Sequence, residues 1–300
     1  MTAGYRHEAL VYDDDEELLA TAVPFLRDAT DAGEAALVSM GERSAGLIRS
    51  ALPRSAAVVY ASGDDVYRRP AGAIRSYRDL MAGLVADGVP RIRLIGELPA
   101  DVFGPAWDGW MRYEAAANVA YAEFPLWAMC AYDRRVTGPA RLDDVAHTHP
   151  GTAAYAGPVA FLTRPHAAPP DPLEAMPPAA DLLDPVPAAA RAAVRAADPG
   201  GVPADAVTDL VLAVSEAVTN AIRHGRPPVR VRVWPGGDRL VVAVSDGGPG
   251  PADPYAGLLP VAGGPDGGRG MWIIQQSADQ VVLRRGPDGC TLRLTAGVPG

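Results

Sequence analysis

The chain has 300 residues, of which 48% are hydrophobic and 21% are charged, and its formal net charge is −9. This length suits two domains, and the acidic balance, without a basic tract, argues against a main function in binding nucleic acid phosphates. With no apolar run near 18 residues and no signal peptide pattern, we expect a cytoplasmic protein that does not enter a membrane.

Lysine is absent: all 27 residues of the Lys and Arg class are arginine. A Walker A loop, the strand lysine of ordinary protein kinases and Schiff-base chemistry are therefore excluded, because each requires lysine. Any ATP site in this chain must hold the phosphates without it. The two cysteines, Cys130 and Cys290, lie in different halves, which argues against a disulfide framework and against a metal held by thiolates.

The first half alternates apolar runs with helical patterns, which favours a parallel sheet with helices on its faces. The predicted strands are Ala35–Met40, Ala57–Tyr60, Ile92–Ile95 and Pro125–Tyr132. The predicted helices are about Glu16–Ala29, Ser44–Leu52, Ile74–Asp87 and Trp107–Tyr121.

Five polar residues of this half form a candidate ligand site. Glu97 follows an apolar strand, and Glu114 and Asn118 are four residues apart on a helix. Cys130 and Asp133 lie at the end of the last strand. They could converge at the carboxyl edge of the sheet, where α/β proteins bind ligands, or pair with one another as ordinary buried polar groups.

Two histidines, His7 and His149, allow a metal site, although scattered histidines are more often structural. Cys130 allows an oxidant sensor or an inert buried thiol.

The segments HEALVYDDDEELLATAVPFL at 7–26, IGELP at 95–99, RYEAAAN at 112–118, PLWAMCAYD at 125–133 and THP at 148–150 resemble the MEDS sensory domain. The resemblance covers about Arg6 to Pro150. It implies a RecA-like fold without a working phosphate loop, and an unidentified small organic molecule as the signal.

The segment 165–187 reads PHAAPPDPLEAMPPAADLLDPVP. Proline at this density cannot continue a helix or a central strand, so we expect an extended linker. The predicted organisation is a sensory domain at 1–164, a linker at 165–187 and a second domain at 181–297.

The second half places helices before strands, which favours one sheet under a layer of helices. The predicted helices are about Ala188–Ala197, Ala204–His224 and a short one from about Met271. The predicted strands are Val229–Trp234, Leu240–Ser245, Gln280–Arg285 and Cys290–Thr295.

The helix at 204–224 carries an apolar stripe and, away from it, a polar pair. The stripe comprises Leu210, Val211, Val214, Val218, Ala221 and Ile222, and we expect it to be buried. Glu216 and Asn220 lie on adjacent turns of one face. An amide oxygen suits Mg²⁺ and a nearby carboxylate can accept a proton, whereas the alternative is a solvated helix face.

Two glycine-rich segments follow this helix. Asp246 ends a strand and precedes glycines at 247, 248 and 250, so it can accept a hydrogen bond from an amine such as that of adenine. The stretch 251–270 is typical of a lid or a disordered segment. It ends in GGRG before a helix, and glycines that open a helix present free N–H groups to phosphate.

The segments SEAVTNAIRHG, SDGGPG and GGRGMWIIQQSADQV resemble the N, G1 and G2 boxes of the GHKL ATPase superfamily, in the form found in anti-sigma-factor serine kinases. The resemblance covers about Asp181 to Thr295 and implies a Bergerat α/β two-layer sandwich that binds ATP and Mg²⁺. It implies that Asn220 ligates Mg²⁺, that Glu216 is the general base and that Asp246 binds adenine. It places Gly248 and Gly250 beside the base, and Gly268, Arg269 and Gly270 beside the phosphates. For Arg269, a contact with phosphate and a solvent-exposed position are equal alternatives. For His224, a packing role is favoured over a role in the N box.

The two resemblances together imply a signal-responsive protein serine/threonine kinase. It would bind a sigma factor and phosphorylate a serine on an antagonist protein, and it could form a homodimer. Two alternatives stay open, namely an ATP-binding partner-switching module without phosphotransfer and a soluble histidine kinase. The latter needs an acceptor among His147, His149 and His166, none of which lies on a helical heptad.

Overall fold

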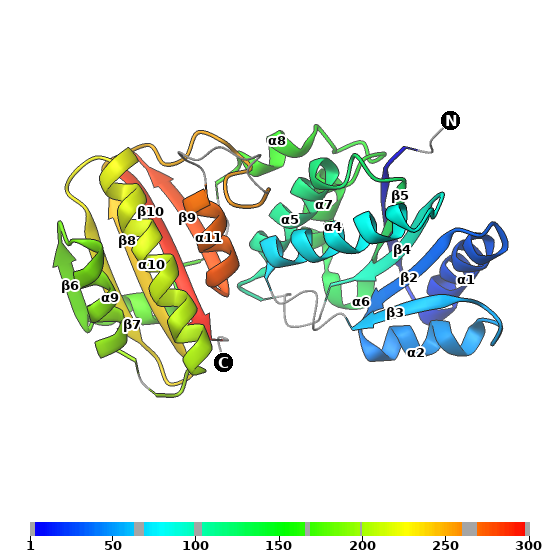
Figure 1. The fold of residues 1–300 in the computed structure, drawn as a ribbon, viewed down its shortest axis with the longest axis horizontal. Coiled ribbons are helices and arrows are strands. Elements are labelled where there is room, and N and C mark those ends of the chain that lie inside the picture. Colours follow the sequence, from blue (N-terminus) through cyan, green and yellow to red (C-terminus); the bar gives the residue numbers. More distant parts are fainter. Residues whose placement is uncertain are drawn as a thin grey trace. The chain divides into compact units, whose positions relative to one another are not determined.

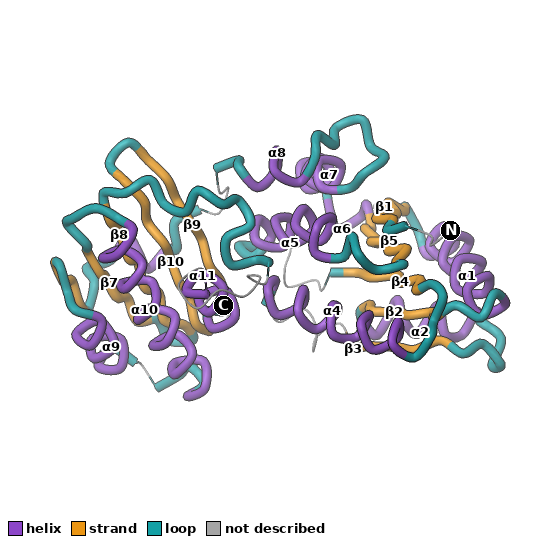
Figure 2. Tube along the Cα trace, turned by 45° about the horizontal axis from the view of Figure 1, so that its top comes forward, coloured by secondary structure: helices purple, strands orange, loops and turns teal. Residues whose placement is uncertain are grey.

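The computed structural model describes residues 4–62, 69–98, 104–165, 169–198, 200–259 and 269–297 (Figures 1 and 2). These residues form two compact units, one comprising most of the chain up to Leu162 and the other the chain from Thr163 onward. No helix within the described residues is long and apolar enough to cross a membrane.

The first unit is a parallel five-stranded sheet in the order β1-β5-β4-β2-β3, flanked by helices. Its strands are β1 (Arg6–Tyr12), β2 (Ala35–Met40), β3 (Val58–Ser62), β4 (Ile92–Glu97) and β5 (Leu126–Asp133). Its helices are α1 (Asp15–Asp31), α2 (Glu42–Ala51), α4 (Pro70–Ala86), α5 (Trp107–Ala120), α6 (Arg134–Thr137), α7 (Pro139–Thr148) and α8 (Pro158–Leu162). The predicted fold class is confirmed, but the edge strand β1 was not predicted, because charged Arg6 and Glu8 interrupt its apolar pattern.

The two faces of this sheet are covered by different helices. Ile95, Met129 and Ala131 pack on one face with residues of α1 and α2. The residues that alternate with them, Ala128 and Cys130 among them, line a cavity under α4 and α5 on the other face. This alternation follows from the pleat of a strand, which sends successive side chains to opposite sides.

The second unit is an antiparallel sheet in the order β6-β7-β8-β10-β9, with three helices on one face (Figure 1). The strands are β6 (Ala180–Leu183), β7 (Arg230–Pro235), β8 (Arg239–Asp246), β9 (Gln280–Gly286) and β10 (Gly289–Gly297). The helices are α9 (Pro187–Ala196), α10 (Ala204–His224) and α11 (Arg269–Ser277). The predicted two-layer sandwich is therefore confirmed.

Helix α10 is the centre of this core. Leu210, Val214 and Val218 are fully buried against valines and leucines of the sheet, as the apolar stripe predicts. Ile222 is 54% exposed, so its assignment to the buried stripe is wrong. It lies at the margin of the stripe in the last turn of the helix, whereas Ala221 in the same turn is buried in the core.

The proline-rich segment belongs to the second unit, so the prediction of a separate linker over 165–187 is wrong for its described residues, although β6 within it is extended. It contains a short 3-10 helix, η2 (Pro172–Ala175), then β6, and α9 begins at Pro187. Leu173 packs against Trp234, Val241 and Ala243, on the sheet face opposite the three helices. Residues 166–168 lie outside the described part of the chain.

Acidic residues between the prolines hold this segment in place. Both carboxylate oxygens of Asp171 accept hydrogen bonds of 3.1 Å from Arg239. Glu174 accepts from Arg293 at 2.9 Å, and the Arg293 side chain is only 3% exposed. The proline content correctly excludes regular helix, but these pairs join residues far apart in the chain, which local sequence patterns do not show.

Replacing Glu174 with alanine should destabilise the second unit by about 3 kcal/mol, because a buried guanidinium would lose its carboxylate. Amide exchange of the full-length protein should then be about 100-fold faster in β8 and β10. Asp238→Ala is the matched control, since Asp238 is the exposed partner of Arg239 and its removal should change exchange little. Equal exchange in the Glu174 variant and the parent would show that the segment does not stabilise the sheet.

Candidate functional site

A cavity of about 670 Å³ opens in the second unit beside α10, within the range typical of small-molecule sites. Its polar lining includes Asn220 and His224 of α10 and Asp246 at the end of β8. Apolar walls come from Met271, which lies in the segment GGRGMWIIQQSADQV, and from residues outside the sequence motifs, Tyr255, Leu283, Cys290 and Leu292 among them.

Asp246 is fixed through one carboxylate oxygen. Its Oδ1 accepts hydrogen bonds from the backbone N–H of Gly248 at 2.6 Å and of Arg226 at 3.2 Å. A Cβ atom on Gly225 would lie 2.3 Å from this oxygen, and one on Gly248 would lie 2.6 Å from it. Because Oδ2 has no hydrogen bond to any described residue, it can accept one from a ligand amine in the cavity.

Asn220 lies against the start of α11. A Cβ atom on Gly270 would be 2.8 Å from Asn220 Oδ1, so only glycine fits there without displacing the amide. The first N–H groups of a helix lack partners within the helix and carry a partial positive charge, which suits phosphate. An amide oxygen beside them suits a Mg²⁺ ion that also contacts phosphate.

The other predicted residues of this site are placed as follows. Glu216 is half-buried one turn before Asn220 and is not in the cavity lining. His224 is exposed and lines the cavity, so the interpretation of His224 as a packing residue is wrong. Arg269, the first residue of α11, is exposed, and Gly268 lies outside the described residues.

Gly250 and Cys290 form one corner of the cavity. Gly250 has a φ of +74°, and a Cβ atom there would lie 2.9 Å from Cys290 Sγ, so glycine is required both by the backbone and by the space. Burial and nearby Asp246 raise the pKa of Cys290 to about 11. Cys290 is therefore a neutral thiol at neutral pH and contributes an apolar contact.

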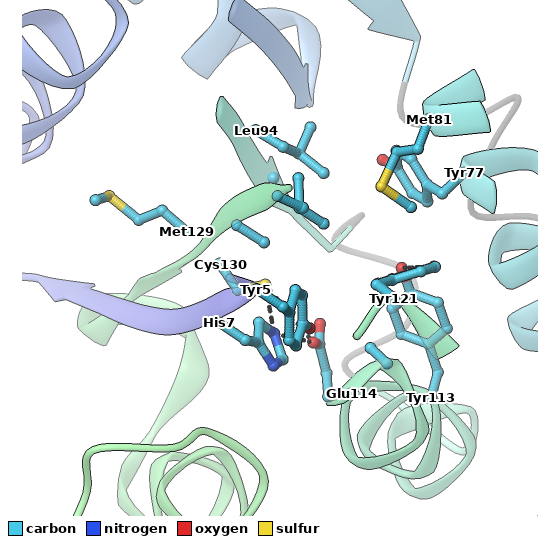
Figure 3. A pocket seen from close by; sticks show the side chains of 14 residues that line it. Tyr5, His7, Tyr77, Met81, Leu94, Tyr113, Glu114, Tyr121, Met129 and Cys130 are labelled. Atoms are coloured by element: carbon cyan, nitrogen blue, oxygen red, sulfur yellow. Dashed lines mark hydrogen bonds and ion pairs between the residues drawn. The ribbon is translucent and has the colours of Figure 1, made fainter. Parts of the chain in front are cut away.

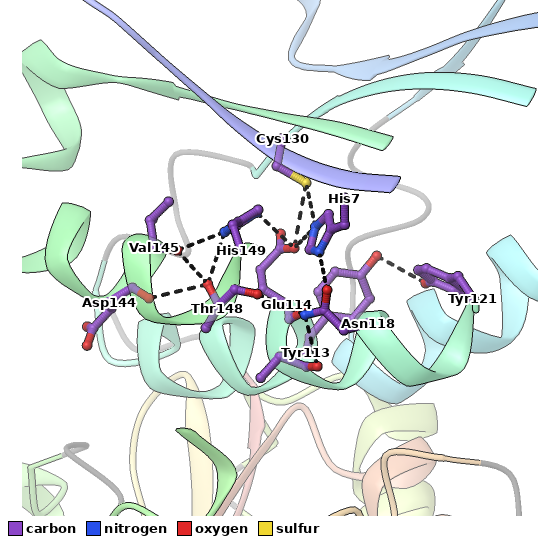
Figure 4. Close-up of polar contacts among 11 residues, drawn as sticks. His7, Tyr113, Glu114, Asn118, Tyr121, Cys130, Asp144, Val145, Thr148 and His149 are labelled. Carbon is purple, nitrogen blue, oxygen red and sulfur yellow. Dashed lines mark hydrogen bonds and ion pairs between the residues drawn. The ribbon is translucent and has the colours of Figure 1, made fainter. Parts of the chain in front are cut away.

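A second candidate site lies in the first unit, where the structure brings together three of the five residues predicted there (Figure 4). Glu114 and Asn118 of α5 meet Cys130 of β5, and His7 of β1 and His149 just after α7 join them. His7 Nε2 is 3.1 Å from Glu114 Oε2 and 3.3 Å from Cys130 Sγ. His7, Glu114 and His149 are buried, and Cys130 is partly buried.

Glu97 and Asp133 do not belong to this cluster, so the prediction of one convergent site of five residues is wrong. Glu97 is paired in register with Ala131, and Asp133 is three residues after Cys130, so both belong to the opposite face of the sheet from Cys130. Glu97 accepts a hydrogen bond of 3.3 Å from Tyr12, and burial raises its pKa. Hydrogen bonds from Arg135 lower the pKa of Asp133.

Burial and charge act against each other in the cluster. Burial by itself would raise the pKa of Glu114, but the hydrogen bond with His7 and the proximity of His149 leave this pKa below its usual value. Burial, together with nearby His7, lowers the pKa of His149 to about 4, so this ring is neutral at neutral pH. Burial and the adjacent Glu114 raise the pKa of the Cys130 thiol.

The space next to the cluster is small and mostly apolar (Figure 3). Its lining includes Tyr5, Tyr77, Tyr113 and Tyr121, and its volume is about 20 Å³, enough for one water molecule. An organic molecule would have to displace side chains to enter it.

Comparison with known proteins identifies both units. Residues 6–150 match the MEDS family, described as the methanogen/methylotroph, DcmR sensory domain. Residues 179–296 match the family of histidine kinase-like ATPase domains. The chain joins a MEDS domain to a histidine kinase-like ATPase domain. No curated protein matches the sequence.

Three solved structures are similar to parts of this MEDS–ATPase chain. The RsbU and RsbW domains of Rv1364c from Mycobacterium tuberculosis are 21% identical over 40% of this chain and 33% of that chain, with a TM-score of 0.28. This chain thus spans about a third of that protein. The histidine kinase domain of the Escherichia coli osmosensor EnvZ is 20% identical over 42% of this chain and 92% of that chain, with a TM-score of 0.25. The histidine kinase domain of the blue-light-activated kinase of Erythrobacter litoralis is 15% identical over 66% of this chain and 94% of that chain, with a TM-score of 0.27.

Alanine at Gly225 should destabilise the ATPase domain by about 1–3 kcal/mol, since its Cβ would overlap Asp246 and a backbone carbonyl. Calorimetry of the full-length protein should show a melting temperature lower by about 4 °C or more. Gly286→Ala is the control, because a Cβ there meets nothing within 4 Å. Equal melting temperatures for the two variants would contradict the close contact of Gly225 with Asp246.

Proposed function

We propose that the ATPase domain binds Mg-ATP in the 670 Å³ cavity and phosphorylates a serine of an antagonist protein, and that it thereby controls a sigma factor in response to a signal. One observation carries the nucleotide assignment. Asp246, held through Oδ1 alone, and Asn220, set against the first turn of α11, both line this cavity. An amine acceptor and a magnesium ligand on one cavity are what an adenine nucleotide with its metal requires.

The proposed roles follow the chemistry of each side chain. Asp246 accepts a hydrogen bond from the adenine amine, with Gly248 and Gly250 leaving room for the base. Asn220 ligates Mg²⁺, and Gly268, Arg269 and Gly270 hold the phosphates through backbone N–H groups and a guanidinium in place of lysine. When bound, ATP supplies the phosphoryl group. Glu216 takes the proton of the partner's serine hydroxyl.

The histidine-kinase alternative has little support in the described residues. His149 is fully buried and cannot reach a phosphate without opening the MEDS domain. His147 lies on the ten-residue helix α7 and contacts the carbonyl of Asp143, and this helix is too short for a dimerisation bundle. His166 lies outside the described residues.

The alternative of a partner-switching module without phosphotransfer is favoured by one observation. Glu216, the proposed general base, does not line the cavity. In this alternative ATP shapes the surface that holds the partner, and no phosphate moves. The MEDS domain is the proposed signal input in both cases, as the description of its family as sensory supports.

Asn220→Ala should weaken ATP binding by the full-length protein in the presence of Mg²⁺ by about tenfold or more, and should abolish the difference between titrations with and without Mg²⁺. Isothermal titration measures both effects. Leu212→Ala is the control, because Leu212 is an exposed residue two turns before Asn220 that does not line the cavity. Retention of Mg²⁺-dependent affinity by the Asn220 variant would remove Asn220 from the site.

Glu216→Ala should lower phosphotransfer to the antagonist protein by about 10²–10⁴-fold while ATP binding persists, because only the general base is lost. The measurement is transfer of labelled phosphate from ATP, followed by acid treatment of the product. Phosphoserine survives acid, whereas phosphohistidine does not. Acid-labile label would favour the histidine kinase, and partner binding without any label on the parent protein would favour the binding module.

A further inference from the structure

We propose that the buried cluster of the MEDS domain, His7, Glu114, Cys130 and His149, is a binding site for a divalent cation of the zinc class. Each residue offers one ligand atom, and these four atoms lie within 4.8 Å of one another. They come from different elements, namely β1, α5, β5 and the end of α7 (Figure 4). The proposal is independent of the ATP site.

The spacing of the ligand atoms fits a tetrahedral ion. Four of the six separations are 3.1 Å for His7 Nε2 to Glu114 Oε2, 3.3 Å for His7 Nε2 to Cys130 Sγ, 3.6 Å for Cys130 Sγ to Glu114 Oε2 and 3.7 Å for His149 Nε2 to Glu114 Oε2. The other two are at most 4.8 Å. Zinc bonds of about 2.0–2.3 Å in tetrahedral geometry require ligand atoms about 3.3–3.7 Å apart. Small side-chain movements would therefore complete the site.

Asn118 fixes the orientation and the tautomer of His7. Its amide nitrogen donates to three backbone carbonyls, those of Glu114, Ala115 and Thr148. The amide oxygen is thereby turned toward His7 Nδ1, at 3.1 Å. An oxygen can only accept, so Nδ1 carries the proton and Nε2 faces Glu114 and Cys130. Such a partner behind a histidine is the usual arrangement in metal sites.

His149 is held in the same way. Its Nδ1 is 2.9 Å from the carbonyl oxygen of Val145, which can only accept, so Nδ1 is the protonated nitrogen. The lone pair of Nε2 then points toward Glu114. This nitrogen is buried and has no hydrogen-bond partner among the described residues. An unsatisfied buried acceptor is costly, and a cation would satisfy it.

The cluster has one donor for three acceptors at its centre. The two ring lone pairs and the carboxylate are acceptors, and only the Cys130 thiol donates, to Glu114 at 3.6 Å. An ion pair between protonated His7 and Glu114 would explain the 3.1 Å contact but would leave His149 Nε2 without a partner. A divalent cation resolves both: the thiol loses its proton to water, and two anionic ligands neutralise the charge of the ion in a buried site.

The donor set selects the class of ion. Two imidazoles, one thiolate and one carboxylate suit Zn²⁺ and its substitute Co²⁺, whereas Mg²⁺ and Ca²⁺ require oxygen ligands. Four protein ligands with room for only a water molecule nearby describe a closed, structural site. Two cysteines in different halves of the chain cannot form a site of several thiolates. The proposed site needs only one thiolate, that of Cys130, and is compatible with this cysteine count.

The test is metal analysis of the full-length, untagged protein, kept reduced, equilibrated with ZnCl₂ or CoCl₂ and then desalted. We expect about one metal per chain by mass spectrometry, and with Co²⁺ a thiolate charge-transfer band and the intense visible bands of tetrahedral coordination. A parent protein with no stoichiometric metal and no such spectrum would overturn the proposal.

Variants assign the ligands. Cys130→Ser should remove the thiolate band, His149→Ala should reduce the bound metal to well below one per chain, and Asn118→Ala should weaken affinity about 10–100-fold. His147→Ala and Cys290→Ser, which change a histidine and a cysteine outside the cluster, should keep both metal and spectrum. Circular dichroism checks that each variant is folded. Where a variant does not fold, the metal content and the Co²⁺ spectrum of the parent protein decide whether the proposal stands. Full metal content and an unchanged spectrum in folded Cys130→Ser and His149→Ala would also overturn the proposal.

Discussion

In a pleated sheet neighbouring side chains point to opposite faces, and this constraint decides which strand residues can reach each candidate site. In the MEDS domain it separates Cys130 from Asp133, three residues away, so that only Cys130 meets the residues of α5. In the ATPase domain it gives one sheet face to α9, α10 and α11 and the other to the segment around Leu173. Both faces of each sheet must be covered, because both carry apolar side chains.

In the proposed nucleotide site, the absence of lysine leaves backbone groups and arginine as the means of holding phosphate. Such a site depends on close approach, since N–H groups act only at hydrogen-bond distance. Gly225, Gly248 and Gly270 are required by a different contact, because a Cβ at each would collide with Asp246 or Asn220. These glycines therefore set the positions of the two polar residues, and Gly225 and Gly270 also line the cavity.

The MEDS domain gathers three of its buried ionisable side chains, His7, Glu114 and His149, under α5. Backbone carbonyls hold Asn118 and His149, and Asn118 in turn orients His7, so the side chains around Glu114 are positioned before any ligand arrives. A buried group of this kind joins four elements of the fold. A change in the occupancy or protonation of this cluster would therefore alter contacts of β1, β5, α5 and α7.

Local pattern and motif order in the sequence determined the two fold classes, the predicted strands and helices, and the three boxes of the ATPase domain, whereas β1, β6, α6, α7 and α8 were not predicted. These features depend on residues close together in the chain, such as the periodicity of α10 or the glycines after Asp246. The sequence did not reveal that His7 and His149 complete the cluster with Glu114, or that Asp171 and Glu174 bind the proline-rich segment to arginines of the sheet. Only the tertiary structure decided these contacts, because each joins residues distant in the chain. Such a contact is set by the folding of the whole sheet rather than by the residues next to it in the sequence.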